Sequence, residues 1–195
     1  MSDYDTDKTA VVFMADGMEM CECLLTVDIL RRAKVCVITA SVMGRTEIVT
    51  SHGVRLSADD LAENVDYSAA DIIILPGGRT GTENLAASRT VTEQCRAFAS
   101  DPGKRLAAIC AAPSVPAGLG LLDGLKATCH PDFEKAVGRG GKVNITHESV
   151  TVDNNIITGQ GLGATMDFAL RITEELAGRE SAEKIADAVC YRYMK

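Results

Sequence analysis

Residues 71–78 read D-I-I-I-L-P-G-G, a segment typical of a strand in the interior of a parallel β-sheet. Its apolar residues follow one another without polar alternation, which indicates burial on both faces of the sheet. A second run of this kind, Arg105–Ile109 (R-L-A-A-I), ends abruptly at Cys110. Because helical sequence follows both runs, we expect βαβ units and an α/β fold, with a mostly parallel sheet and helices on both faces.

Strand and helix patterns alternate through the rest of the chain. Strands are expected at residues 9–14, 35–40 and 127–129. Helices are expected at 20–33, 88–100, from 113 to 118 or 120, and at 132–137, 164–176 and 182–189. The pattern also predicts a hairpin near 47–53 and a second hairpin over 145–158 that turns at 153–155. No repeat or low-complexity linker interrupts this order. We therefore expect a single domain over residues 1–195, with a flexible N-terminal tail at 1–8.

The composition argues against several classes of function. The chain carries 20 Lys or Arg against 27 Asp or Glu, a formal net charge of −7, which disfavours a nucleic-acid binder that neutralises phosphates. No apolar run approaches the roughly 18 residues that a membrane span needs. The polar first eight residues do not resemble a targeting peptide, and the seven cysteines are an odd number. We expect a cytoplasmic protein with reduced thiols.

Cys110 is the first candidate for chemistry. It follows a buried strand and precedes A-A-P, so the sequence predicts a strand–turn–helix segment that carries a nucleophile on the turn. The N-terminus of the following helix should favour the thiolate and lower the pKa of the Cys110 thiol. The backbone N–H of Ala111, with a second donor from the turn at Gly77-Gly78, would stabilise an oxyanion on a carbonyl that the sulfur attacks.

Two further side chains are expected at the same edge of the sheet, because ligands bind at the carboxyl ends of parallel strands. His130 follows a predicted strand and precedes Pro131, so it can act there as an acid or base. Glu22 follows the first strand among apolar and thiol neighbours, where a carboxyl tends to have a raised pKa and can donate a hydrogen bond to a thiolate. Cys110 alone could be an ordinary buried cysteine, but three unlike groups at one edge favour a reactive site.

Five segments, in this order, resemble a known family. They read A-D-G-M-E-M-C-E-C-L-L-T-V-D-I-L-R-R-A (15–33), D-I-I-I-L-P-G-G (71–78), A-A-I-C-A-A-P (107–113), A-T-C-H-P (127–131) and G-L-G-A-T-M-D-F-A-L (161–170). The chain resembles the ThiJ/PfpI superfamily, and within it the parkinsonism-associated protein deglycase branch (DJ-one). The resemblance implies a flavodoxin-like α/β sandwich, a homodimer formed through the first helix, and no metal or nucleotide cofactor.

The resemblance also implies roles for the candidate residues. Cys110 takes the position of the nucleophile, Glu22 that of a protonated glutamate and His130 that of the histidine, while Gly78 and Ala111 match the backbone donors near the cysteine. In the protease-like branch of the family a histidine follows the cysteine directly. Ala111 stands at that position here, which weakens an interpretation as a peptidase.

Two functions remain open at this point. The first is a cofactor-independent cysteine enzyme that acts on reactive 2-oxoaldehydes or glycated groups, as a glutathione-independent glyoxalase or protein deglycase with a role in oxidative and carbonyl stress. The alternative is a redox-sensing stress protein or chaperone, in which Cys110 is oxidised to sulfinate without turnover. Both functions use the same three side chains. A role in thiazole metabolism ranks last, because no residue indicates phosphate binding.

Overall fold

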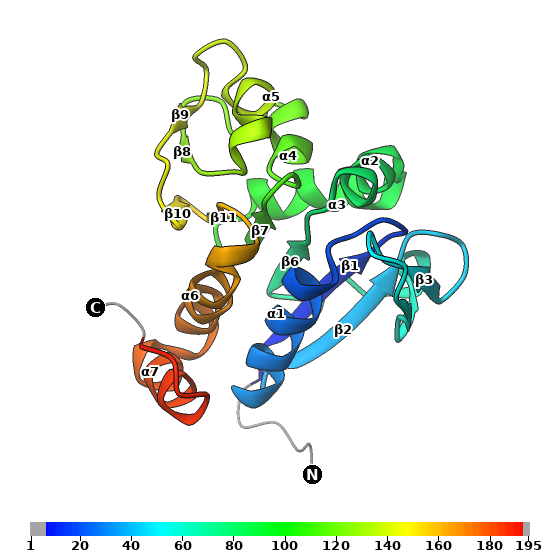
Figure 1. The fold of residues 1–195 in the computed structure, drawn as a ribbon, viewed down its shortest axis with the longest axis vertical. Helices are drawn as coiled ribbons and strands as arrows, with labels where there is room; N and C mark the ends of the chain where they lie inside the picture. The colour runs from blue at the N-terminus through cyan, green and yellow to red at the C-terminus, as the bar shows by residue number, and fades with distance from the viewer. Residues whose placement is uncertain (1–6, 193–195) are drawn as a thin grey trace.

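A seven-stranded β-sheet forms the centre of the computed structural model, which describes residues 7–192 (Figure 1). Neighbouring strands are parallel throughout, except for the antiparallel pair β10–β11 at one edge. The strands, in spatial order, are β10 (Val150–Asp153), β11 (Ile156–Gly159), β7 (Arg105–Ile109), β6 (Ile72–Leu75), β1 (Thr9–Met14), β2 (Cys36–Ser41) and β5 (Asp60–Leu61). The expectation of a mostly parallel sheet is confirmed.

Helices cover both faces of this sheet (Figure 1). α1 and α6 pack against each other on one face, and α2, α3 and α4 cover the other. The bounds are α1 Met20–Arg32, α2 Arg79–Ala87, α3 Arg89–Ser100, α4 Ser114–Gly118, α5 Glu134–Gly138, α6 Thr165–Ala177 and α7 Arg179–Ala188. The helices on both faces that the alternating pattern predicted are therefore present.

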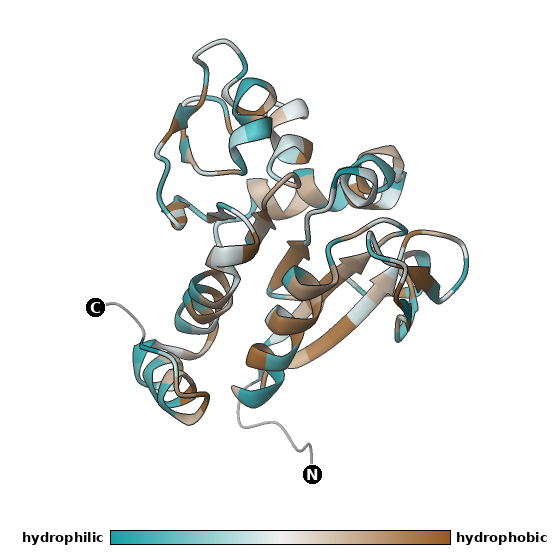
Figure 2. Ribbon diagram, in the orientation of Figure 1, coloured by the Kyte–Doolittle hydropathy of each residue, from teal (hydrophilic) through white to brown (hydrophobic). Residues whose placement is uncertain are grey.

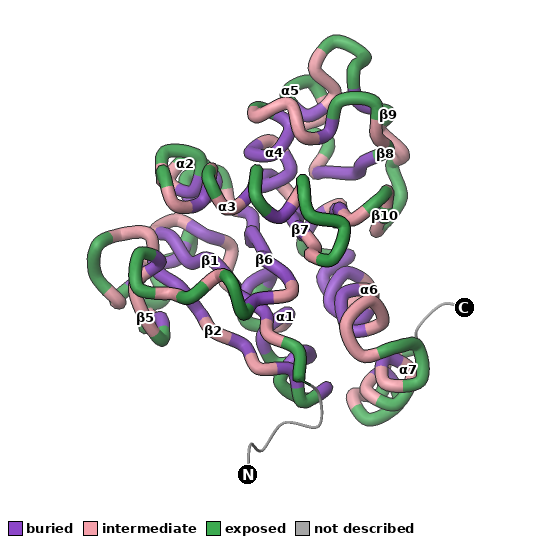
Figure 3. The backbone as a smooth tube through the Cα atoms, turned by 180° about the vertical axis from the view of Figure 1, so that it is seen from behind, coloured by how far each residue is buried: buried purple, intermediate pink, exposed green. Residues whose placement is uncertain are grey.

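The hydrophobic core lies in two layers because side chains alternate along each strand. In β6, Ile73 and Leu75 belong to the cluster that contains Phe98 of α3. Ile74 belongs to the opposite cluster, which contains Phe168 of α6. The central strands are accordingly hydrophobic in Figure 2 and buried in Figure 3.

The structure corrects one expectation about the peripheral elements. The first hairpin forms as β3 (Glu47–Val49) and β4 (Arg55–Ser57), but the second begins only at Val150. The residues before it form β9 (Asn144–Ile145), which pairs in parallel with β8 (Lys126–Ala127) in a separate two-stranded sheet. The expected hairpin over 145–158 is therefore too long at its start.

α2 was not predicted by the sequence pattern. Its sequence R-T-G-T-E-N-L-A-A has weak helix formers in its first turn, and no side chain caps its N-terminus. Its place depends on packing, because a Cβ on Gly81 would stand 2.6 Å from the Cα of Met18. Glycine thus lets α2 approach the loop after β1 closely.

The expected N-terminal tail lies only partly within the described residues. Residues 1–6 fall outside them, whereas the Lys8 ammonium lies 2.7 Å from the Asp71 carboxylate. The Lys8 carbonyl also accepts a hydrogen bond from the N–H of Cys36 at 3.0 Å. Lys8 is thus anchored to the sheet. No helix within residues 7–192 is long and apolar enough to cross a membrane.

Candidate active site

Cys110 stands on a strained turn directly after β7. Its φ angle is 66°, in the left-handed region that residues other than glycine rarely adopt. The Cys110 N–H donates to the carbonyl of Gly159 in β11, and the Cys110 carbonyl accepts the N–H of His130, both at 2.9 Å. These bonds fix the turn from both sides. The geometry is that of a nucleophile on a sharp strand end, and such strain is common at functional sites.

The helix after this turn differs from the expectation. Residues 110–113 form consecutive turns, and α4 begins at Ser114 with only five residues. The helix dipole acts mainly within the first turn of a helix and falls off beyond it. Its effect on the Cys110 sulfur is therefore weaker than the sequence suggested.

Glu22 lies in the first turn of α1, and its carboxyl interacts with the Cys110 thiol. Its side chain is buried, with 1% of the residue exposed. Oε2 accepts the N–H of Gly77 at 2.9 Å. Oε1 is buried without a hydrogen-bond partner among the described residues, and the Cys110 thiol is the polar side chain that interacts with this carboxyl.

The pKa values of the two groups are both raised. Burial raises the pKa of Glu22 to about 7, against the opposing effects of the Cys110 thiol and the Gly77 N–H. Burial, followed by the charge of Glu22, raises the pKa of Cys110 to about 12. The expected lowering of the thiol pKa is therefore wrong: burial and a neighbouring carboxylate outweigh the favourable backbone groups. Near neutral pH, Glu22 is the member of the pair that changes charge.

Two backbone donors lie at the Cys110 sulfur, as the sequence suggested. The N–H groups of Gly78 and Ala111 both interact with it and lower its pKa. Gly78 has a φ angle of 88°, and a Cβ there would stand 2.5 Å from the carbonyl oxygen of Gly17. Glycine is thus required for the turn after β6 to direct its N–H toward the sulfur.

His130 completes the group of expected residues. Its Nδ1 accepts the backbone N–H of Asp132 at 3.2 Å, so the neutral ring carries its proton on Nε2. Cδ2 of this ring and Sγ of Cys110 both lie within 4 Å of the position that a Cβ on Gly161 would occupy. The His130 side chain is 44% exposed and therefore accessible to a small molecule. The structure thus brings all five candidate residues to one edge of the sheet.

Several neighbours of this site were missed by sequence reasoning. Gly161 begins the segment 161–170, and a Cβ at its position would stand 3.9 Å from Sγ of Cys110, which places this segment beside the sulfur. Asp132 and Phe133 lie next to His130, and Arg79 contacts both of them; none of the three carries a motif of its own. Within residues 7–192, no group of three or more His, Cys, Asp or Glu side chains is arranged to hold a metal ion.

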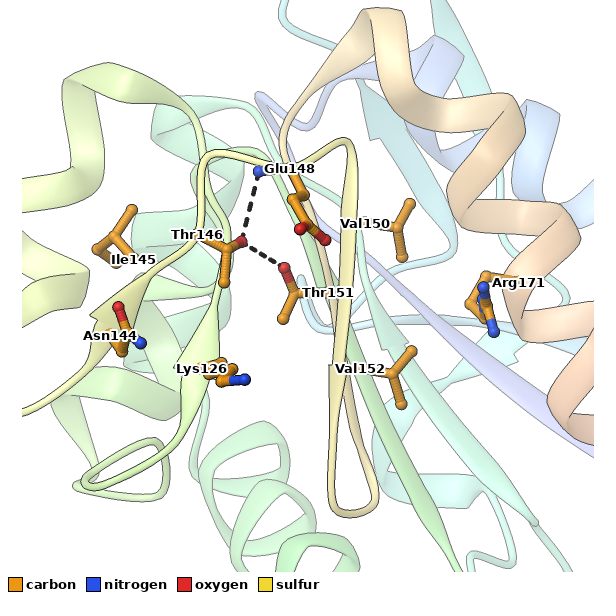
Figure 4. Close-up of a pocket in the computed structure, with 9 residues that line it drawn as sticks. All are labelled: Lys126, Asn144, Ile145, Thr146, Glu148, Val150, Thr151, Val152 and Arg171. Atoms are coloured by element: carbon orange, nitrogen blue, oxygen red, sulfur yellow. Dashed lines mark hydrogen bonds between the residues drawn. The ribbon is translucent and has the colours of Figure 1, made fainter. Parts of the chain in front are cut away.

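A separate pocket of about 640 Å³ lies along the edge strand β10 (Figure 4). Val150 and Val152 point toward Arg171 of α6, whereas Thr151 points the other way, toward Thr146. The hydroxyls of Thr146 and Thr151 lie 2.5 Å apart. None of the five candidate residues lines this pocket, so it is distinct from the Cys110 site.

Gly77 provides a test of how tightly the site is packed. A Cβ at this position would stand 2.6 Å from both the Cβ of Cys110 and Oε2 of Glu22. We expect Gly77→Ala to lower the free energy of unfolding by about 1–3 kcal/mol, because both neighbours must move. Gly138→Ala is the matched control, since its Cβ would meet only Ile145 at 3.7 Å. Equal urea midpoints for the two variants would contradict this packing.

Comparison with known proteins places the chain among characterised relatives. Residues 8–175 match the model of the DJ-1/PfpI family. Protein DJ-1alpha of Drosophila melanogaster is 37% identical, over 95% of this chain and 85% of that protein. A Caenorhabditis elegans protein named glutathione-independent glyoxalase DJR-1.2 is 30% identical, over 94% of this chain and 96% of that protein. The chain spans less than half the length of two Arabidopsis thaliana relatives, DJ-1 homologs B and A, of which it covers 42% and 47%.

Solved structures have the same architecture. The crystal structure of Drosophila melanogaster DJ-1beta matches with a TM-score of 0.90 at 33% identity, covering 95% of this chain and 99% of that chain. A Toxoplasma gondii DJ-1 structure, described as oxidized, matches with a TM-score of 0.89 at 34% identity, covering 95% and 100%. These likenesses confirm the flavodoxin-like α/β fold and the resemblance found in the sequence. The chain belongs to the DJ-1/PfpI family.

Proposed function

We propose that the protein is a cofactor-independent cysteine enzyme that converts small 2-oxoaldehydes such as methylglyoxal to 2-hydroxy acids without glutathione, and that it removes related glycated adducts. The observation that carries this proposal is the pairing of Cys110 with Glu22. A thiol on a strained turn lies beside a buried carboxyl whose pKa is about 7. A group that gains or loses a proton near neutral pH is suited to general acid–base catalysis. The glyoxalase relative described above supports the same substrate class.

The first step is attack of Sγ on the aldehyde carbon. Because the Cys110 thiol has a raised pKa, it is protonated at rest and needs a base as it reacts. The ionised Glu22 carboxylate takes this proton while the S–C bond forms. The N–H groups of Gly78 and Ala111 stabilise the negative charge that develops on the aldehyde oxygen. The protonated Glu22 then gives its proton to that oxygen, which yields a hemithioacetal on Cys110 and restores the carboxylate.

The second stage moves a hydrogen between the two carbons of the substrate. A carboxylate at Glu22 removes the proton from the former aldehyde carbon, and the electron pair passes to the neighbouring carbonyl. His130 carries its proton on Nε2, so it supplies a proton to that carbonyl oxygen. Glu22 then returns its proton to the second carbon, and the hydroxyl on the first carbon gives its proton back to His130. The product is a thioester, in which the first carbon is oxidised and the second reduced. Water then hydrolyses the thioester, which releases lactate from methylglyoxal and restores the thiol.

Replacement of the nucleophile tests the proposal directly. Cys110→Ser should lower the rate of lactate formation from methylglyoxal, without glutathione, by more than about 1,000-fold, because a serine hydroxyl is far less nucleophilic here. Cys190→Ser is the control, since Cys190 is an exposed thiol at the end of α7. Lactate is measured enzymatically over time. Full methylglyoxal consumption by Cys110→Ser would refute the enzyme interpretation.

The role of Glu22 predicts a pH dependence. The carboxylate must be ionised to accept the Cys110 proton, so kcat/KM should rise with pH through about 7 and fall below it as Glu22 becomes protonated. Glu22→Gln should lose about 100-fold in kcat, because an amide cannot accept that proton. The measurement is lactate formation between pH 5 and 9. A profile without an inflection near 7 would argue against Glu22 as the base.

A redox sensor is the second candidate, and one observation favours it. Cys110 is partly accessible, and Oε1 of Glu22 is buried without a partner among the described residues. A protonated Glu22 could donate a hydrogen bond to an oxygen of a Cys110 sulfinate. The two functions separate in one experiment. Appreciable lactate production supports the enzyme, whereas its absence, together with ready oxidation of Cys110 by peroxide, supports the sensor.

We further propose that two copies form a homodimer in the cytoplasm. Leu24 and Leu162 are 41% and 54% exposed, and both belong to segments that carry the Cys110 site. Exposed apolar side chains grouped near a site commonly mark an interaction surface. Leu24→Glu should shift the protein toward monomers in sedimentation velocity, because a charge would be buried between the copies. Val152→Glu is the control on a distant exposed apolar residue, and a wild-type monomer would refute the proposal.

A further inference from the structure

A group of four side chains joins the start of α2 to the segment that carries His130. The guanidinium Cζ of Arg79 lies 5.0 Å from the centre of the Phe133 ring, over its face. Arg79 Nη2 also lies 3.9 Å from Oδ2 of Asp132. The His130 ring meets the Phe133 ring edge-on, with centroids 6.5 Å apart and an interplanar angle of 77°. We call Arg79, Asp132 and Phe133 the Arg79 clasp.

The clasp contributes little to the stability of the fold. The Arg79 and Asp132 side chains are both 66% exposed, and water screens the attraction between exposed charges. A cation–π contact at an exposed site is weak for the same reason. Small energies are nevertheless sufficient to choose between orientations of one side chain. The place of the clasp is more informative than its strength. Arg79 directly follows Gly78, a donor to the Cys110 sulfur, and Asp132 and Phe133 both approach the His130 ring.

Asp132 connects the clasp to the His130 ring. Its Oδ2 lies 3.9 Å from Arg79 Nη2 and 3.9 Å from His130 Nδ1. The backbone N–H of Asp132 donates to that same Nδ1 at 3.2 Å, which requires Nδ1 to be an acceptor. A carboxylate that approached Nδ1 more closely would instead favour a proton on Nδ1. Arg79 attracts the Asp132 carboxylate toward α2 and so opposes a shift of the His130 proton from Nε2 to Nδ1.

We propose that Arg79 is a positioning residue for His130: through Asp132 and Phe133 it holds the imidazole edge-on to Phe133 with Nδ1 as an acceptor and the proton on Nε2. The charged or titratable groups near this ring include Asp132 and Cys129 on its own segment and Arg79 from α2. The Cys110–Glu22 pair lies at the end of β7 and the start of α1. The effect of Arg79 on turnover rests on the proposed function, because it requires His130 to supply a proton. The effect of Arg79 on the orientation of the ring is independent of that function.

The test uses the full chain and the variant Arg79→Gln, with Arg89→Gln as the control. Arg89 makes an ion pair with Glu93 within α3, so the control removes the same charge elsewhere. Side-chain ¹⁵N chemical shifts of His130 report which ring nitrogen carries the proton. Arg79→Gln should increase the share of rings protonated on Nδ1, and should lower kcat for methylglyoxal about tenfold with KM little changed. The control should alter neither quantity.

A second variant examines whether the clasp acts as a unit. Phe133→Leu removes the ring that Arg79 and His130 share, and should change the His130 shifts in the same direction as Arg79→Gln. The double variant should lower kcat no further than the stronger single variant, because both changes release the same ring. Arg79→Lys retains the charge near Asp132 and should restore part of the wild-type signal.

The outcomes separate this proposal from the proposed function. Unchanged ¹⁵N shifts in Arg79→Gln would overturn the proposal, even where kcat falls, because Arg79 would then act on the substrate directly. Additive losses in the double variant would also overturn it. If the wild-type protein forms no lactate, the proposed enzymatic function is refuted. The ¹⁵N shifts of His130 would still show whether Arg79 positions the ring.

Discussion

The site depends on the burial of one carboxyl group beside one sulfur. Removing the Glu22 carboxyl from water disfavours its charged form, and within residues 7–192 the one backbone N–H that donates to it is that of Gly77. The charge of Glu22 in turn opposes ionisation of Cys110. Near neutral pH the thiol therefore keeps its proton, and the carboxyl of Glu22 is the group that gains or loses one.

This pair can form only because several strand ends meet within a small space. Glu22 comes from the helix after β1, Gly77 and Gly78 from the turn after β6, and Cys110 from the turn after β7. Adjacent parallel strands bring these segments to the same edge of the sheet. Glycine at position 77 then allows the carboxyl and the cysteine to approach each other, since any Cβ there would occupy the space between them.

The pattern of apolar and small residues predicted those strands and turns that depend on neighbouring residues in the sequence. The uninterrupted apolar run of β6 and the small residues around Cys110 indicated a buried parallel strand and a tight turn, and both are present. The pKa of Cys110 was not predictable in this way, because it reflects the balance between burial, Glu22 and two N–H donors that lie apart in sequence. The same holds for α2, whose weak helical sequence is stabilised by close packing of Gly81 on Met18.

Long-range contacts account for the other features that the sequence did not reveal. The sequence pattern predicts a hairpin that includes Ile145 of β9. In the structure the N–H of Asn144 donates to the carbonyl of Leu125 at 2.9 Å, and β9 pairs with β8 instead. Arg79 and Phe133 belong to separate elements, and neither has a neighbour in sequence that would indicate their contact. Such pairs follow from the arrangement of the sheet edge and not from any periodicity of the chain.

Strain and burial at this edge are difficult to explain by stability alone. A non-glycine residue in the left-handed region costs about 1–3 kcal/mol, which glycine at position 110 would avoid. A buried carboxyl with one oxygen unpartnered among the described residues is also unfavourable, and an apolar side chain of similar size would remove that penalty. Both unfavourable features occur together, at the strand ends where open α/β sheets bind ligands. Their coincidence is the strongest physical argument that this edge is retained for chemistry.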